Sequence, residues 1–125
     1  MNQNPSTMPM IEIMDTTLRD GEQTNGVSFT AHEKKNIARL LVKELNVDRL
    51  EIASARVSDG ELEAVRRIAQ WANEAGCLDR FEVLGFVDGG RSLAWIRDAG
   101  CRTMNLLCKG SLRHLTEQLR RTPEQ

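Results

Sequence analysis

Short apolar runs alternate with stretches of helical periodicity along most of this chain, and no other feature constrains the fold as much. The apolar runs lie at residues 10–14, 49–53, 81–87 and 103–108. Between them, apolar residues recur every three or four positions, as in amphipathic helices: Ile37, Leu40, Leu41 and Leu45; Leu62, Val65, Ile68, Ala69 and Ala72; Leu93, Ile96 and Ala99. Strands that alternate with helices of this length predict right-handed crossovers and a parallel sheet, an α/β fold.

Start and stop signals for the expected helices agree with this periodicity. The segments Thr30–Glu33 and Ser58–Glu61 both have the spacing of a capping box. Asn46, Gly76 and Gly100 stand where a left-handed residue commonly ends a helix. A further helix is expected to begin at residue 111 and to run to about residue 120.

Polar residues interrupt the expected strands, although parallel strands buried on both faces are normally continuous in Val, Ile and Leu. The interrupting residues are Glu12, Glu51, Glu82 and Asn105. Period-two alternation places one set on a common face: Glu51 with Ala53, Glu82 with Leu84 and Phe86, and Asn105 with Leu107. In a barrel this set would face the lumen. An open doubly wound sheet explains the alternation equally well, but fits mid-strand acids less comfortably.

Composition narrows the classes of protein to consider. The 125 residues suffice for one domain, and 40% hydrophobic with 28% charged residues is typical of a soluble globular protein. A net charge of −1 argues against a nucleic-acid-binding surface, and no apolar run is long enough to span a membrane. Residues 1–9 resemble no secretory signal, which predicts a disordered tail on a cytoplasmic protein. Cys77, Cys101 and Cys108 are expected to be buried, reduced thiols.

The stretch DTTLRDGEQ at residues 15–23 is the densest group of charges in the chain. It follows the first expected strand, and α/β folds build their sites at the carboxyl ends of parallel strands. Asp20 offers a hard oxygen ligand for a divalent ion, and the neighbouring Arg19 offers a cation that could stabilise developing negative charge. A solvated turn with an Asp–Arg ion pair is the alternative.

DTTLRDGEQ resembles the signature of the DRE-type metal-dependent TIM-barrel family, which includes 2-isopropylmalate, homocitrate and citramalate synthases. The resemblance extends over nearly the whole chain. The segments LNVDRLEIASARVSDGELEAV, EVLGFVDGG and MNLLCKGSL look most like (R)-citramalate synthase. The resemblance implies that the chain forms the first half of a TIM (β/α)8 barrel.

The resemblance also implies roles for single residues. Asp20 would be a ligand of a divalent metal, either Zn, Mn or Mg, and Arg19 would polarise the keto group of a 2-oxo acid. Glu51 would lie in the active site near the reacting carbons. Gln23 would contact substrate or orient Asp20, with a structural hydrogen bond as the alternative.

Leu84 and Leu107 would line the pocket for the side chain of the acceptor. Both have the lumen-facing parity found above, and plain core packing is the alternative for each. Bulky aliphatic walls suit pyruvate better than 2-oxoisovalerate, although a pocket discriminates only modestly, by about 1–3 kcal/mol per methylene.

The activity implied is the condensation of acetyl-CoA with pyruvate and water to give citramalate and CoA, as in isoleucine biosynthesis. A barrel of this type needs eight strands and ~250 residues, and the family's His-x-His metal ligands do not occur here. We therefore expect residues 10–125 to be the N-terminal half of a synthase barrel, inactive alone, from a parent enzyme that is a homodimer. A 2-isopropylmalate or homocitrate synthase is one alternative; a non-catalytic half-barrel that binds a metal or a partner is the other.

Overall fold

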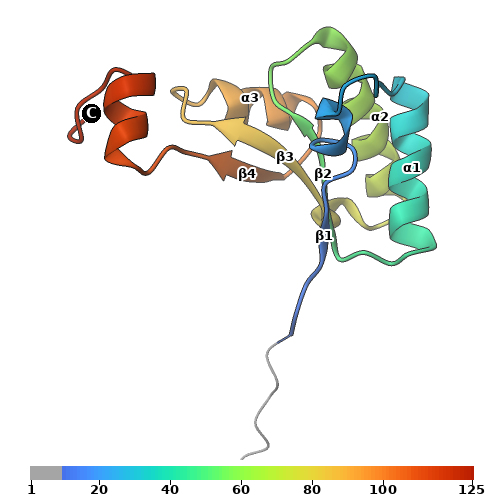
Figure 1. The fold of residues 1–125 in the computed structure, drawn as a ribbon. Coiled ribbons are helices and arrows are strands. Elements are labelled where there is room, and N and C mark those ends of the chain that lie inside the picture. The colour runs from blue at the N-terminus through green and yellow to red at the C-terminus, as the bar shows by residue number, and fades with distance from the viewer. Residues whose placement is uncertain (1–9) are drawn as a thin grey trace, which may run out of the picture.

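The computed structural model describes residues 10–125 as a four-stranded parallel sheet with helices in the connections (Figure 1). In chain order the strands and helices are β1 (Met14–Asp15), α1 (Ala31–Lys43), β2 (Arg49–Ser54), α2 (Asp59–Glu74), β3 (Phe81–Phe86), α3 (Arg91–Asp98) and β4 (Thr103–Leu107). Short 3-10 helices lie at Gly21–Gln23 and Leu78–Arg80. The strand order is β1-β2-β3-β4. The expected α/β fold, with parallel βα units that form half of a TIM barrel, is confirmed.

The first strand is shorter than the sequence predicts. The residues of β2, β3 and β4 differ from the expected ranges by one residue at most, always at the carboxyl end. In β1, by contrast, only Met14 and Asp15 pair with β2, whereas the sequence predicts the strand at residues 10–14. The backbone N–H of Ile13 donates to the Asp48 carboxylate at 2.7 Å, while the Ile13 carbonyl accepts from the Arg49 N–H at 3.1 Å, so the ladder begins at this carbonyl. The expected tail at 1–9 lies outside the described residues.

Helix α1 begins with a complete capping box. The Thr30 hydroxyl accepts from the Glu33 N–H at 3.2 Å, and the Glu33 carboxylate accepts from the Thr30 N–H at 2.8 Å. At α2 only half of the box forms. The Ser58 hydroxyl accepts from the Glu61 N–H at 3.1 Å, but the Glu61 carboxylate binds Lys34 instead. The residue pattern therefore locates both helix starts, while tertiary contacts decide what the second glutamate does.

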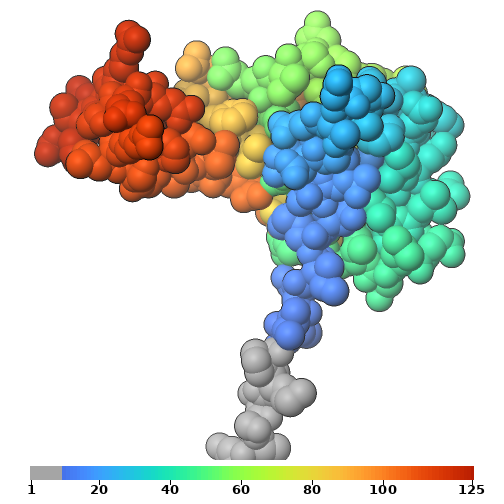
Figure 2. Space-filling view, viewed as in Figure 1, coloured from blue at the N-terminus to red at the C-terminus, as the bar shows by residue number. Residues whose placement is uncertain are grey.

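The helix ends follow the predicted stop signals. Asn46, Gly76 and Gly100 all have left-handed backbone angles, with φ of 51°, 68° and 90°. The expected helix at 111–120 forms at residues 112–118, with π-helical geometry at His114–Gln118. Figures 1 and 2 show this C-terminal segment beyond β4, at the opposite end of the sheet from α1. Its side chains are mostly exposed there, so little tertiary packing stabilises a longer helix.

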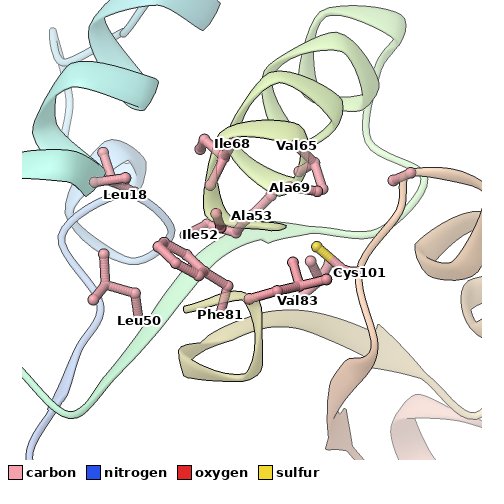
Figure 3. Packing of buried hydrophobic residues seen from close by; sticks show 14 of the residues in the cluster. Leu18, Leu50, Ile52, Ala53, Val65, Ile68, Ala69, Phe81, Val83 and Cys101 are labelled. Carbon is pink, nitrogen blue, oxygen red and sulfur yellow. The ribbon is translucent and has the colours of Figure 1, made fainter. Parts of the chain in front are cut away.

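The hydrophobic core lies between the sheet and its helices (Figure 3). Phe81 and Val83 of β3 face Val65 and Ile68 of α2. The Trp71 ring meets Phe81 edge-on, with ring centroids 6.1 Å apart. Burial is not shared by the three cysteines: Cys101 is buried, which raises the pKa of its thiol to about 11, whereas Cys77 is half-buried and Cys108 is exposed. The expectation of three buried thiols is therefore wrong for two of them.

A β-bulge in β2 changes which side chains face the core. Glu51 pairs with Glu82, but the next pair is Ala53 with Val83, so Ile52 is an extra residue. Both Ile52 and Ala53 are fully buried in the hydrophobic core. The placement of Ala53 on the face of Glu51 is therefore wrong, because strict alternation does not continue through a bulge. Within residues 10–125, no helix has the length and apolar character to cross a bilayer.

Candidate active site

The charged stretch after β1 folds into a tight turn stabilised by its own first acid. The Thr16 carbonyl accepts hydrogen bonds from the N–H groups of Arg19, Asp20 and Gly21, at 3.1, 2.8 and 3.2 Å. The Asp15 carboxylate accepts from the backbone and hydroxyl of Thr17. Asp15 therefore shapes the turn, while Arg19 and Asp20 are presented at the carboxyl end of the sheet.

A buried ionic network joins Arg19 to the sheet. Arg19 Nε donates to Oε1 of Glu51, and Arg19 Nη1 donates to Oδ1 of Asp20 at 3.0 Å. The second oxygen of Glu51 accepts from the side-chain amide of Asn105. Glu51 is fully buried in the middle of β2, and Asn105 lies in β4. Both carboxylate oxygens are thus engaged, which fixes the guanidinium on the face that alternation predicts for Glu51 and Asn105.

A second arginine–glutamate pair lies beside the first. Glu82 is the register neighbour of Glu51 on β3, and its buried carboxylate accepts from Arg49 Nε. This hydrogen bond raises the pKa of the Arg49 guanidinium above its ordinary value. Two adjacent buried carboxylates would repel each other if they were unpaired, so each has its own arginine. The lumen position of Glu82 follows from alternation, but its arginine partner was not predicted.

The side chain of Asp20 is 63% exposed and has Arg19 as its ion-pair partner. Its carboxylate is chemically suited to be one oxygen ligand of a divalent ion. Among residues 10–125, however, no group of three or more His, Cys, Asp or Glu side chains could hold an ion. The described residues therefore fit one metal ligand and not a complete metal site.

A pocket of about 500 Å³ opens beside Arg19, between the loops that follow β1 and β2. Gln23 lines it, together with Phe29 and Ser54. The bulge in β2 explains the position of Ser54, which pairs with Leu84 after the register shift. The structure thus brings Arg19 and Gln23 together in the lining of one pocket. Residues of the loops after β1 and β2 complete this lining.

The two predicted acceptor residues lie apart from this pocket. Leu84 is buried in β3, paired with Asn105 of β4, and so lies on the face of the ionic network. Leu107 is 40% exposed and lines a separate apolar groove of about 320 Å³, with Phe86 and the C-terminal segment. Leu84 and Leu107 share the face predicted for them, but Leu84 does not line the groove that contains Leu107.

One further ion pair at this end of the sheet was not predicted. Arg56 Nη1 donates to the Asp88 carboxylate at 2.9 Å and joins the loops after β2 and β3. Asp88 also accepts from the backbone N–H and the hydroxyl of Ser92. The hydrogen bonds from Ser92, together with the ion pair with Arg56, lower the pKa of Asp88 to about 2. Arg56 has a left-handed backbone, with φ of 64°. Local sequence gives no signal for this pair, because it depends on the spacing of two strands.

A family model described as HMGL-like matches residues 10–125, the whole described part of the chain. The chain belongs to the HMGL-like family. The predicted membership in the DRE-type TIM-barrel group, to which 2-isopropylmalate, homocitrate and citramalate synthases belong, is confirmed by this match and by the relatives.

The relatives of this HMGL-like chain carry the names of several synthases. A 2-isopropylmalate synthase from Pyrococcus furiosus is 42% identical over 117 residues, covering 92% of this chain and 23% of the relative. A protein of Methanoculleus marisnigri named "Putative (R)-citramalate synthase CimA" is 41% identical over 115 residues, covering 92% of this chain and 22% of its own length. The homocitrate synthase AksA of Methanopyrus kandleri is 60% identical over 57 residues, covering 46% and 14%. The chain therefore spans less than a quarter of the length of these relatives.

Proposed function

We propose that residues 10–125 are the N-terminal half of the catalytic barrel of an acetyl-CoA-dependent condensing enzyme for 2-oxo acids. The observation that carries this proposal is the Arg19–Glu51–Asn105 network, which joins the loop after β1 to the middle of the sheet, in a chain of the HMGL-like family. The reaction proposed for the parent is that of (R)-citramalate synthase: acetyl-CoA, pyruvate and water give citramalate and CoA. Its parent is proposed to be a cytoplasmic homodimer.

In this proposal Arg19 acts on the keto oxygen of the acceptor. When the acetyl carbon adds to the keto carbon, negative charge develops on that oxygen, and a fixed guanidinium stabilises it. Glu51 keeps the guanidinium in place with one oxygen, while Asn105 fixes the other. Because both oxygens are engaged, the geometry supports a positioning role for Glu51 rather than the role of the base.

Asp20 is proposed as one ligand of a divalent ion, Zn, Mn or Mg, whose other ligands are not among residues 10–125. Such an ion would supply Lewis-acid polarisation of the 2-oxo acid. The exposed carboxylate, next to the arginine that would contact the same substrate, supports this role. Gln23, on the wall of the adjacent pocket, is proposed to contact substrate.

Leu84 and Leu107 are proposed to line the acceptor site and to favour the methyl group of pyruvate. The support for this role is that both side chains lie on the same face of the sheet. Leu107 itself lines a separate groove of the described chain. The main alternative is a 2-isopropylmalate synthase, because that name is the more frequent among the relatives. A homocitrate synthase is the other acceptor class that a relative's name suggests.

A chimeric enzyme tests the proposal by placing residues 10–125 within a complete relative. Residues 10–125 replace the aligned segment of the Pyrococcus furiosus relative, and release of CoA from acetyl-CoA is measured with pyruvate, 2-oxoisovalerate and 2-oxoglutarate. We expect release with pyruvate as the preferred acceptor. Arg19→Ala should lower the rate by about 10²–10³-fold, the usual loss when one charge-stabilising donor is removed.

The unmodified relative and the variant Arg67→Ala serve as controls, because Arg67 lies on the exposed face of α2 and, among residues 10–125, forms an ion pair only with Glu63. Preference for 2-oxoisovalerate would reassign the chain to the isopropylmalate class. A folded chimera that releases no CoA with any of the three acids contradicts the enzymatic proposal and favours a non-catalytic half-barrel that binds a metal or a partner.

A further inference from the structure

Lys34 is a lysine on the buried face of a helix, where an apolar residue would be expected. It lies one turn before Ala38 and two turns before Leu41 on α1, and all three side chains face the core. Its own side chain is only 1% exposed. A buried ammonium group is unfavourable unless it is paired. The helix does not need a charge here, so the reason for the lysine lies in its partners.

Two carboxylates from different elements meet at the Lys34 ammonium. Lys34 Nζ lies 2.5 Å from Oε2 of Glu22 and 2.5 Å from Oε1 of Glu61. Glu22 belongs to the 3-10 turn just after Asp20, and Glu61 belongs to the first turn of α2. A single cation on α1 thus joins the loop after β1 to the neighbouring helix, and Figure 1 shows α1 and α2 side by side.

Glu22 closes the same loop upon itself. Its second oxygen, Oε1, accepts from the backbone N–H of Phe29 at 2.9 Å. One carboxylate therefore joins residue 22 to residue 29 at the end of the loop, and Lys34 in turn fixes this carboxylate to α1. Arg19, Glu22 and Glu61 all line the pocket of about 500 Å³. Because the Lys34 ammonium contacts both Glu22 and Glu61, it sets the distance between these two residues of the pocket lining.

We propose that Lys34 is the positioning residue of the candidate active site, holding the loop that presents Arg19 and Asp20. The assignment of a catalytic purpose to that loop rests on the proposed function, whereas the anchoring itself does not. The sequence predicted no role for Lys34. Without its charge, the loop should open locally while the sheet and the helices remain folded.

Amide hydrogen exchange on the 125-residue chain tests this directly. In Lys34→Met, which keeps the length of the side chain and removes the charge, amides of residues 19–29 should exchange about tenfold faster or more. Amides of Ile52 and Val83 in the central strands should accelerate much less than those of the loop. The matched control Arg67→Met removes an exposed ion pair of α2 and should change neither region. Equal acceleration in loop and strands, or no acceleration in the loop, overturns the proposal.

A second variant covers the case in which Lys34→Met fails to fold because Glu22 and Glu61 are left unpaired. Lys34→Met combined with Glu22→Gln and Glu61→Gln removes all three charges, and the amide oxygen introduced by Glu22→Gln can still accept from the Phe29 N–H. This triple variant should fold and should still show fast exchange in residues 19–29. Wild-type exchange there would overturn the proposal. Since exchange needs no turnover, a failed anchor and a failed condensing activity are told apart.

Discussion

Arg19 Nε donates to a carboxylate oxygen of Glu51, so that the loop after β1 is joined to the middle of β2 by an ion pair whose acid is fully buried. Removing the arginine by Arg19→Met would leave this carboxylate with Asn105 as its remaining side-chain partner. We expect the free energy of unfolding to fall by roughly 3 kcal/mol, as for other broken buried pairs. Urea unfolding of the 125-residue chain measures this loss.

The double variant Arg19→Met/Glu51→Met removes both charges and should recover most of that loss, because no buried charge then lacks a partner. The exposed pair Arg113–Glu117 provides the control, and Arg113→Met should change the unfolding free energy by less than about 0.5 kcal/mol. If Arg19→Met were as mild as the control, the network would contribute nothing to stability.

Gly85 is in close contact with the side chain of Met104 on the neighbouring strand. A Cβ at residue 85 would lie 2.4 Å from Met104 Sδ and 3.3 Å from Ser92 Cβ. Gly85→Ala should therefore destabilise the chain by about 1–3 kcal/mol through overpacking. In a Met104→Ala background the same change should cost less, which a thermodynamic cycle from urea unfolding measures. Equal costs in both backgrounds would show that Met104 is not the obstacle.

Acid should loosen the contact between the loops after β2 and β3. The pKa of Asp88 is lowered to about 2 from an ordinary value of 3.8, chiefly by its hydrogen bonds with Ser92. The ionised form is therefore favoured by folding, and its stabilisation is complete above about pH 4 and is lost as the pH falls from about 4 to 2. In Asp88→Asn, the melting temperature should decline less over this interval. An unchanged pH dependence would contradict the prediction.

The acceptor preference of the chimera should respond to Leu84. Leu84→Ala removes bulk from the face that carries Glu51 and Asn105, so that longer 2-oxo acids fit better. The ratio of kcat/KM for 2-oxoisovalerate to that for pyruvate should rise about tenfold or more. A general loss of stability lowers kcat/KM for both acids equally, so it does not change this ratio. Leu106→Ala, on the opposite face of β4, should leave the ratio unchanged; equal effects of the two variants would remove Leu84 from the acceptor site.

Association of the isolated chain is expected from its uncovered edges. Ile11 and Ile13 beside β1, and Leu106 in β4, are 83%, 64% and 52% exposed. Edges with unpaired backbone groups and apolar side chains favour pairing with another chain. Sedimentation velocity should show dimers or larger species, and Ile13→Lys with Leu106→Lys should shift the distribution toward monomer. A monodisperse wild-type monomer would contradict this prediction.

The sequence predicts the sheet because burial imposes a period of two on strands and 3.6 on helices. Alternation also brings Glu51 and Asn105 to one face, although 54 residues separate them. It misplaces Ala53, because a bulge at Ile52 depends on how β2 fits against β3. It could have singled out Lys34, which shares the helical face of Ala38 and Leu41. It could not supply the partners of Lys34, since these are set by the packing of a loop and a second helix.

The order of the strands in the sheet is the order in which a ribosome makes them. Each new strand is added to an edge that is already complete, and none has to be inserted between two earlier ones. The partners of Glu51 are made at different times, because Arg19 precedes it in the chain and Asn105 follows it by 54 residues. During synthesis this carboxylate therefore lacks its amide partner until β4 has emerged, so the ionic network is complete only when the fourth strand arrives.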